Sequence, residues 1–167
     1  VCCGTGNLAC AIAAARPRAR GWALDLTAPC AELARRNLTR LGFADRVEVR
    51  QGDLLAPVAD LAPGALALIV CNPPYISTGK LATRDDLADE PREAFDGGPY
   101  GISIHQRVAR EALPLLAAGG WLVCELGLGQ DRQVRMLFER ARGYDELTLI
   151  SDAAGAPRVL AARRAAS

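Results

Sequence analysis

The chain has 167 residues, of which half are hydrophobic and 23% are charged, and its formal net charge is +1. This is the composition of an ordinary globular protein, and we expect one domain spanning residues 1–167. The near-neutral charge provides no global field that would attract nucleic acid, and no apolar run reaches the roughly 20 residues of a membrane-spanning helix. Neither nucleic acid nor a membrane is therefore the expected partner.

The cysteines argue against a zinc site. Six are present, but none forms a Cys-x-x-Cys pair, and the single histidine is His105. Zinc sites need clustered Cys and His ligands, so no metal is expected. Cys71 and Cys124 lie inside apolar strand-like runs, where cysteine acts as a small hydrophobic residue. This pattern fits a reducing compartment, and the predicted location is the cytoplasm.

Helices and strands are expected to alternate along the chain. The first half predicts the end of a strand at 1–3 whose beginning is absent, a helix over 7–15, a strand over 21–26, a helix capped by Thr27 and ended by Gly42, and strands over 47–50 and 66–71. The second half predicts a helix over 102–116 broken by Gly119-Gly120, a strand over 121–126, a helix over 130–142, and strands over 147–150 and 158–162. Such alternation is typical of a doubly wound α/β sheet, mostly parallel, and the last two strands are close enough to form an antiparallel hairpin.

Four strand ends carry residues suited to a nucleoside cofactor. Gly4 and Gly6 let a ligand approach the backbone, because neither has a Cβ. Asp25 lies 19 residues after Gly6, where a carboxylate can accept both ribose hydroxyls. Asp53 ends the next strand, where its oxygens can accept from an adenine amino group. Either aspartate alone is equally well explained as a helix cap or turn residue, but the ordered set, completed by Asn72, favours a cofactor pocket.

The kind of cofactor follows from what the glycine turn lacks. No third glycine follows at dinucleotide spacing, and there is no Gly-Lys-Ser/Thr phosphate loop. S-adenosylmethionine is therefore favoured over NAD and ATP.

Residues Asn72-Pro73-Pro74-Tyr75 follow the apolar run 66–71 and are the most informative stretch. The prolines fix φ and stiffen the turn, while Asn72 offers one carbonyl acceptor and two N–H donors. A stiff rim closed by an aromatic ring can hold a planar amide and orient its nitrogen. An ordinary strand-to-loop turn is the alternative.

Taken together, these residues resemble class I methyltransferases, and specifically the HemK/PrmC family of protein glutamine N5-methyltransferases. The resemblance rests on Gly4-Thr5-Gly6, Asp25 with Ala34-Arg35-Arg36-Asn37, Gln51-Gly52-Asp53, Asn72-Pro73-Pro74-Tyr75-Ile76, and Glu90-Pro91 with Phe95-Asp96-Gly97-Gly98. It implies a seven-stranded Rossmann-like sheet with a truncated first strand. It departs from the family at Cys2, which stands where the first glycine is expected, and in lacking the family's helical N-terminal substrate domain.

The resemblance also assigns roles to residues. S-adenosyl-L-methionine would be bound by Cys2, Gly4, Thr5, Gly6, Asp25, Leu26, Gly52, Asp53, Leu54 and Asn72. The methyl acceptor would be bound by Asn72, Pro73, Pro74, Tyr75 and Glu90, with Asn72, Pro73 and Tyr75 catalytic. Hydrogen bonds from the acceptor amide to the Asn72 side-chain oxygen and the Pro73 carbonyl would orient the nitrogen.

The implied acceptor is a glutamine side-chain amide of a protein such as a peptide chain release factor. Three alternatives stay open: an adenine or guanine amino-group methyltransferase acting on nucleic acid, a small-molecule methyltransferase, and a non-catalytic cofactor-binding module. His105 is not needed for methyl transfer and is expected to be a surface or helix residue. The polar segment 76–100 is expected to act as a lid on the acceptor pocket.

Overall fold

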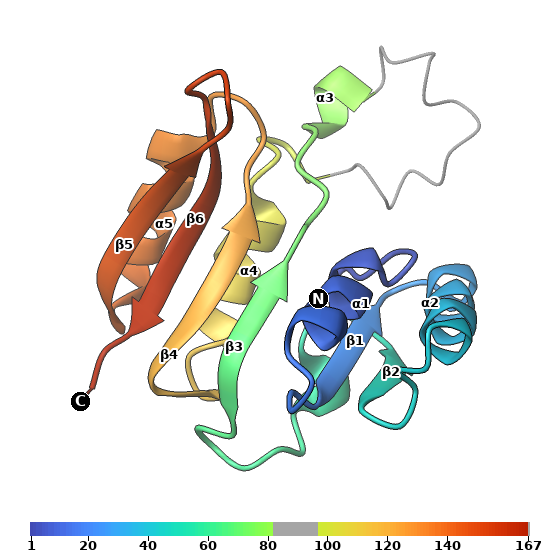
Figure 1. Cartoon of the computed structure of the whole chain (residues 1–167). Coiled ribbons are helices and arrows are strands. Elements are labelled where there is room, and N and C mark those ends of the chain that lie inside the picture. Colours follow the sequence, from blue (N-terminus) through green and yellow to red (C-terminus); the bar gives the residue numbers. More distant parts are fainter. Residues whose placement is uncertain (82–96, 167) are drawn as a thin grey trace. The chain divides into compact units, whose positions relative to one another are not determined.

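The computed structural model describes residues 1–81 and 97–166, and it divides the chain into two compact units, Val1–Asp60 and Leu61–Ser167. Figure 1 labels the elements of both. Each unit has its own sheet, and the single domain expected over 1–167 remains a prediction.

The first unit is built on a pair of parallel strands. Its elements are α1 (Asn7–Ala15), β1 (Gly21–Asp25), α2 (Ala28–Arg40), β2 (Val47–Gln51) and the 3₁₀ turn η1 (Ala56–Val58). β1 and β2 pair in parallel from Gly21 opposite Val47 to Asp25 opposite Gln51, so both strands end at the same edge. α2 packs against both strands.

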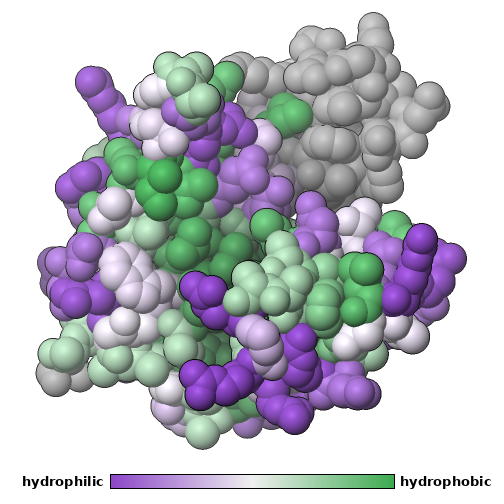
Figure 2. All heavy atoms as spheres, viewed as in Figure 1, coloured by the Kyte–Doolittle hydropathy of each residue, from purple (hydrophilic) through white to green (hydrophobic). Residues whose placement is uncertain are grey.

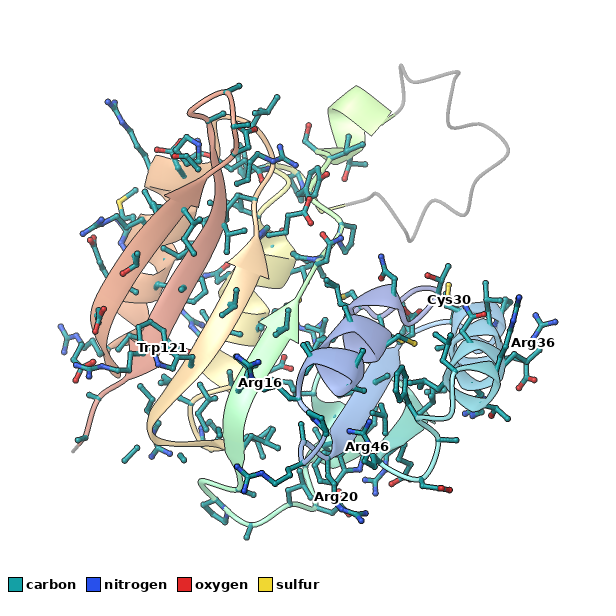
Figure 3. The ribbon with its side chains drawn as sticks, viewed as in Figure 1. Arg16, Arg20, Cys30, Arg36, Arg46 and Trp121 are labelled. Carbon is teal, nitrogen blue, oxygen red and sulfur yellow. The ribbon has the colours of Figure 1, made fainter. Side chains whose placement is uncertain are left out.

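Local sequence explains where the helices of this unit begin and end. The Thr27 side chain accepts a hydrogen bond from the Cys30 N–H, which makes it the N-cap that the sequence predicts. At the end of α1, the Arg46 guanidinium donates to the carbonyls of Ala13, Arg16 and Ala19 (Figure 3). A cation at a helix C-terminus satisfies carbonyls that have no partner within the helix. A small core of Cys10, Ala23 and Leu38 lies between these elements.

The second unit is a four-stranded mixed sheet. Its elements are β3 (Leu66–Cys71), α3 (Thr78–Leu81), α4 (Ser103–Glu111), β4 (Leu116–Glu125), α5 (Asp131–Ala141), β5 (Tyr144–Ser151) and β6 (Pro157–Arg164), with strand order β3-β4-β6-β5. β3 and β4 are parallel, whereas β6 is antiparallel to both β4 and β5. Helices α4 and α5 lie side by side on one face of this sheet (Figure 1).

One boundary expectation was wrong. The helix expected over 102–116 ends at Glu111, and β4 already begins at Leu116 and runs through Gly119-Gly120. The glycines do not break a helix but form an irregularity within the strand: Gly119 has φ +73°, and a Cβ on Gly120 would meet the Ala117 carbonyl at 2.9 Å. A glycine pair inside an apolar run is a signal for a bulge as well as for a break.

The described residues form six strands in two sheets, and the seven-stranded sheet stays a prediction. Residues 1–3 are not assigned to a strand, although the Cys3 N–H donates to the Leu24 carbonyl at 2.9 Å and holds this segment against β1. The α/β class expected from the sequence is confirmed.

Candidate active site

In the first unit, Asp25 joins the glycine turn to the end of β1. The Gly4 N–H donates to Asp25 Oδ2 at 2.8 Å, while Asp25 Oδ1 accepts from the N–H and the hydroxyl of Thr27 at 3.1 and 3.2 Å. Each carboxylate oxygen has two lone pairs, so the Gly4 contact leaves Oδ2 with capacity for a further donor. Asp25 thus holds the glycine turn in place, and it is also the candidate acceptor of hydrogen bonds from the ribose hydroxyls.

The two glycines of the turn face different surroundings. Both have positive φ, +52° at Gly4 and +79° at Gly6. A Cβ on Gly4 would meet nothing within 4 Å, whereas one on Gly6 would lie 3.2 Å from the Ala34 Cβ in α2. Gly4 therefore borders open space, as a cofactor contact requires, and Gly6 lets α2 approach closely. Cys2, where the family has glycine, also holds a positive φ of +54°.

Two side chains that the sequence reasoning assigned no role hold these loops in place. Asn37 Nδ2 donates to the Thr5 carbonyl at 2.9 Å, and Gln51 Nε2 donates to the Leu26 carbonyl at 3.2 Å. The Gly52 N–H adds a bond to the Asp25 carbonyl at 2.8 Å. Asn37 and Gln51 belong to stretches that carry the family resemblance, so these parts of the motifs hold the backbone of the candidate cofactor loops.

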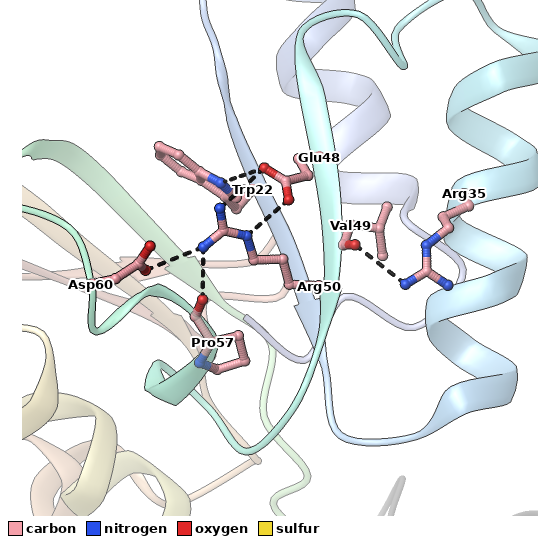
Figure 4. Close-up of polar contacts among 7 residues, drawn as sticks. All are labelled: Trp22, Arg35, Glu48, Val49, Arg50, Pro57 and Asp60. Carbon is pink, nitrogen blue, oxygen red and sulfur yellow. Dashed lines mark hydrogen bonds and ion pairs between the residues drawn. The ribbon is translucent and has the colours of Figure 1, made fainter.

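The loop after β2 is anchored by Arg50 (Figure 4). Its guanidinium donates to the Pro57 carbonyl at 2.9 Å and forms ion pairs with Glu48 and Asp60. Hydrogen bonding to Arg50 lowers the pKa of Glu48. These contacts hold both ends of the segment that carries the candidate residues Gly52, Asp53 and Leu54.

The backbone of this segment is tightly constrained. Leu54 is buried and has φ +48°, and a Cβ on Gly52 would lie 2.6 Å from Pro57 Cγ. The Asp53 side chain is exposed, as is Leu26 beside Asp25, with 52% of its surface accessible. Exposed polar and apolar groups at adjacent strand ends suit a nucleoside.

Burial and the neighbouring Asp25 charge raise the pKa of Cys3 to about 11, so this thiol stays protonated.

In the second unit, the candidate turn leaves β3 at Cys71. Asn72 is exposed and Pro73 is buried. Within the described residues the Asn72 side-chain amide has no hydrogen-bond partner. The turn thus presents an exposed amide beside a buried proline.

The ring of Tyr75 is held from β6. The Arg158 guanidinium carbon lies 5.8 Å from the ring centroid, within cation–π range, and Arg158 Nη2 pairs with Glu125 Oε1 at 3.2 Å. Arg158 was not foreseen as part of the site, and neither was Gln130, whose side chain reaches the Tyr75 carbonyl.

His105 lies on a helix, as expected, but not at the surface: it is fully buried in α4. Its Nε2 is 2.8 Å from the Glu125 carbonyl, and its Nδ1 has no partner among the described residues. Burial lowers the pKa of this imidazole. His105 is therefore a neutral core residue, and its exclusion from the chemistry stays a prediction.

Several expectations lie outside the described residues, including the substrate role of Glu90 and most of the segment 76–100. No cluster of candidate metal ligands occurs in 1–81 and 97–166, and no helix there is long and apolar enough to cross a membrane.

A hollow of about 270 Å³ lies at the other end of β1 from Asp25, so it is not the expected cofactor site. It is lined by Arg20, Gly21, Trp22, Ala44, Asp45, Arg46, Val47 and Glu48.

Comparison with known proteins identifies the family. The profile of the methyltransferase small domain matches residues 1–93, more than half of the chain. The chain belongs to the methyltransferase small domain family. The resemblance to HemK/PrmC proteins is confirmed by the names of its relatives. A release factor glutamine methyltransferase of Moorella thermoacetica is 39% identical over 165 residues, covering 97% of this chain and 57% of the relative.

A second relative carries a different acceptor in its name. A ribosomal protein uL3 glutamine methyltransferase of Bradyrhizobium diazoefficiens is 37% identical over 132 residues, covering 78% of this chain and 40% of the relative. The chain thus spans about half the length of the curated relatives it matches. A methyltransferase structure from Pyrococcus furiosus matches with TM-score 0.67 and 17% identity, covering 98% of this chain and 72% of that one, which supports the fold.

Figure 2 shows hydrophilic residues spread around the visible face, interspersed with apolar ones. The arginines at 16, 18 and 20 are exposed. The guanidinium of the nearby Arg46 donates its hydrogen bonds to carbonyls at the end of α1 and just after it.

Proposed function

We propose that this protein is an S-adenosylmethionine-dependent methyltransferase that modifies the side-chain amide nitrogen of a glutamine in a protein of the translation machinery. The proposal is carried by the exposed side-chain amide of Asn72 in its stiff turn. Within the described residues this amide has no hydrogen-bond partner. Relatives 34–39% identical to the chain that are named glutamine methyltransferases support the proposal.

The cofactor residues proposed in the first unit fit the group. S-adenosylmethionine supplies an electrophilic methyl group on a positively charged sulfur. Gly4 borders open space and Asp25 retains acceptor capacity, so the backbone can approach a nucleoside while the carboxylate accepts its hydroxyls. Leu26 and Asp53 are exposed beside them and are proposed to meet the adenine. Cys2, Thr5, Gly6, Gly52 and Leu54 are proposed to shape the loops around it.

The acceptor residues proposed in the second unit act by positioning. An amide nitrogen is a poor nucleophile because its lone pair is delocalised. Asn72 Oδ1 and the Pro73 carbonyl would accept the two N–H bonds of the glutamine amide, which orients the nitrogen and stabilises the positive charge that develops on it. Tyr75 would pack on the planar group. No residue of the chain has to remove a proton before the methyl group is transferred.

Identity to relatives does not separate the two protein acceptors, since release factor and ribosomal protein enzymes match at 39% and 37%. We take a release factor as the acceptor because that relative matches over nearly the whole chain. The proposed location is the cytoplasm, because the cysteine pattern of the sequence fits a reducing compartment.

The test is to incubate the protein with methyl-labelled cofactor and, separately, a purified release factor, ribosomal protein uL3, and RNA. Label on a release factor that is lost when its acceptor glutamine is replaced by alanine supports the proposal. Label found only on RNA would refute it.

A further inference from the structure

Gln130 uses its whole side-chain amide on three backbone groups around the Asn72–Tyr75 turn. Its Nε2 donates to the Tyr75 carbonyl at 2.8 Å and to the Gly101 carbonyl at 3.1 Å, and its Oε1 accepts from the Gly127 N–H at 2.9 Å. These groups come from the turn itself, from the segment before α4 and from the segment after β4. One side chain thus ties three loops together.

The position of Gln130 makes this use of its amide notable. It stands at the N-cap of α5, where Ser, Thr, Asp or Asn usually binds the first free N–H groups of the helix, yet its side chain makes no such bond. The side-chain amide bonds to the three loops instead. A residue that departs from a local rule for the benefit of distant groups is expected at functional sites.

Two glycines beside this contact, Gly101 and Gly127, leave the room that it needs. A Cβ on Gly101, which has φ +71°, would lie 2.3 Å from the Tyr75 oxygen and 2.8 Å from Gln130 Nε2. A Cβ on Gly127 would lie 2.7 Å from Gln130 Oε1 and 3.0 Å from Tyr75 Cδ2. A Cβ at Gly101 would meet backbone, and one at Gly127 would require the Gln130 amide to move, so the approach of the three loops depends on both glycines.

Just after the turn, the Gly97 N–H donates to the Ile76 carbonyl at 2.7 Å, which is a second anchor for this end of the turn. Its residues 72–75 belong to no strand, and two of the four are prolines without an N–H. The Arg158 contact acts on the Tyr75 ring, whereas Gln130 acts on the Tyr75 backbone, which sets the direction of the chain leaving the turn.

We infer that Gln130 is a positioning residue for methyl transfer, which holds the Asn72–Tyr75 turn in its reactive geometry without touching the acceptor. The inference rests on the proposed function for its catalytic consequence. Gln130→Glu keeps an acceptor for Gly127 but sets carboxylate charge against two carbonyl oxygens. Gln130→Met keeps the length and loses all three bonds. Gln133→Glu makes the same chemical change at an exposed position of α5 and is the matched control.

The experiment measures the order parameter of the Tyr75 N–H by NMR relaxation, together with kcat, the KM of the acceptor, cofactor affinity and Tm. Tyr75 should be rigid, at about 0.85, in the wild type and Gln133→Glu, and should fall toward 0.6 in Gln130→Glu and Gln130→Met. In those two variants kcat should fall roughly 100-fold, the cost of about 1 Å of misplacement, with cofactor affinity within about twofold.

An unchanged Tyr75 order parameter in Gln130→Met would overturn the inference whatever the activity. A loosened turn with unchanged kcat would overturn it as well, and so would parallel losses of Tm, cofactor affinity and kcat, which a purely structural role predicts. A wild type that methylates no glutamine would instead refute the proposed function, and the order parameter would still decide whether Gln130 fixes the turn.

Discussion

Replacing Gly6 with alanine tests how the glycine turn is built. Two terms add at this position. An alanine at φ +79° costs about 1–2 kcal/mol, and the new Cβ would meet Ala34 at 3.2 Å, where overpacking typically costs about 1–3 kcal/mol. The sum is about 2–5 kcal/mol. At roughly 2–4 °C per kcal/mol for a chain of this size, Tm should fall by at least about 4 °C.

Gly4→Ala is the matched control. It carries the same backbone term at φ +52°, but its Cβ meets nothing within 4 Å. Its stability loss should therefore be limited to about 1–2 kcal/mol. Because the open space beside Gly4 is the proposed cofactor position, this variant should instead lose affinity for S-adenosylmethionine. Denaturation followed by circular dichroism and calorimetric titration measure the two effects. Equal stability losses in the two variants would refute the packing argument at Ala34.

Three further outcomes are expected. Asp25→Ala should lower cofactor affinity by about 1–3 kcal/mol and also destabilise the first unit, since Gly4 and Thr27 lose their acceptor; unchanged values in calorimetry and denaturation would remove both roles. Asn72→Ala should lower kcat about 100-fold and leave cofactor affinity nearly intact, and a normal rate would contradict the acceptor role. Burial holds the folded-state pKa of His105 below 6.5, so below that pH the unfolded state binds a proton that the folded state does not. The free energy of unfolding should therefore fall as pH drops below 6.5 and should not depend on this group at higher pH. A His105→Gln variant with the same pH profile would show that His105 is not the cause.

Local signals in the sequence sufficed for several elements. The Ala-rich run 7–15 and the apolar run 66–71 became α1 and β3 with those bounds, and Thr27 caps α2. These features depend on near neighbours. Gly119-Gly120 was misinterpreted because a glycine pair fits either a break or a bulge, and only the pairing of β4 with β3 decides between them.

The supports of the candidate site were out of reach for a related reason. Gln130 lies 55 residues from Tyr75 in sequence, and Asn37 lies 32 residues from Thr5. A hydrogen bond between a side chain and a distant backbone carbonyl leaves no periodicity or spacing to recognise. The burial of His105 was missed because a lone histidine on a helix gives no sign of which face it occupies.

The central claim is that the Asn72–Tyr75 turn presents a protein glutamine for methylation. The most direct measurement is peptide mass spectrometry of a release factor after incubation with S-adenosylmethionine and either the wild-type protein or Asn72→Ala. We expect one methyl group on a glutamine side-chain nitrogen with the wild type and only a trace with Asn72→Ala. Equal methylation by both proteins, or a methyl group on any other atom, would contradict the account.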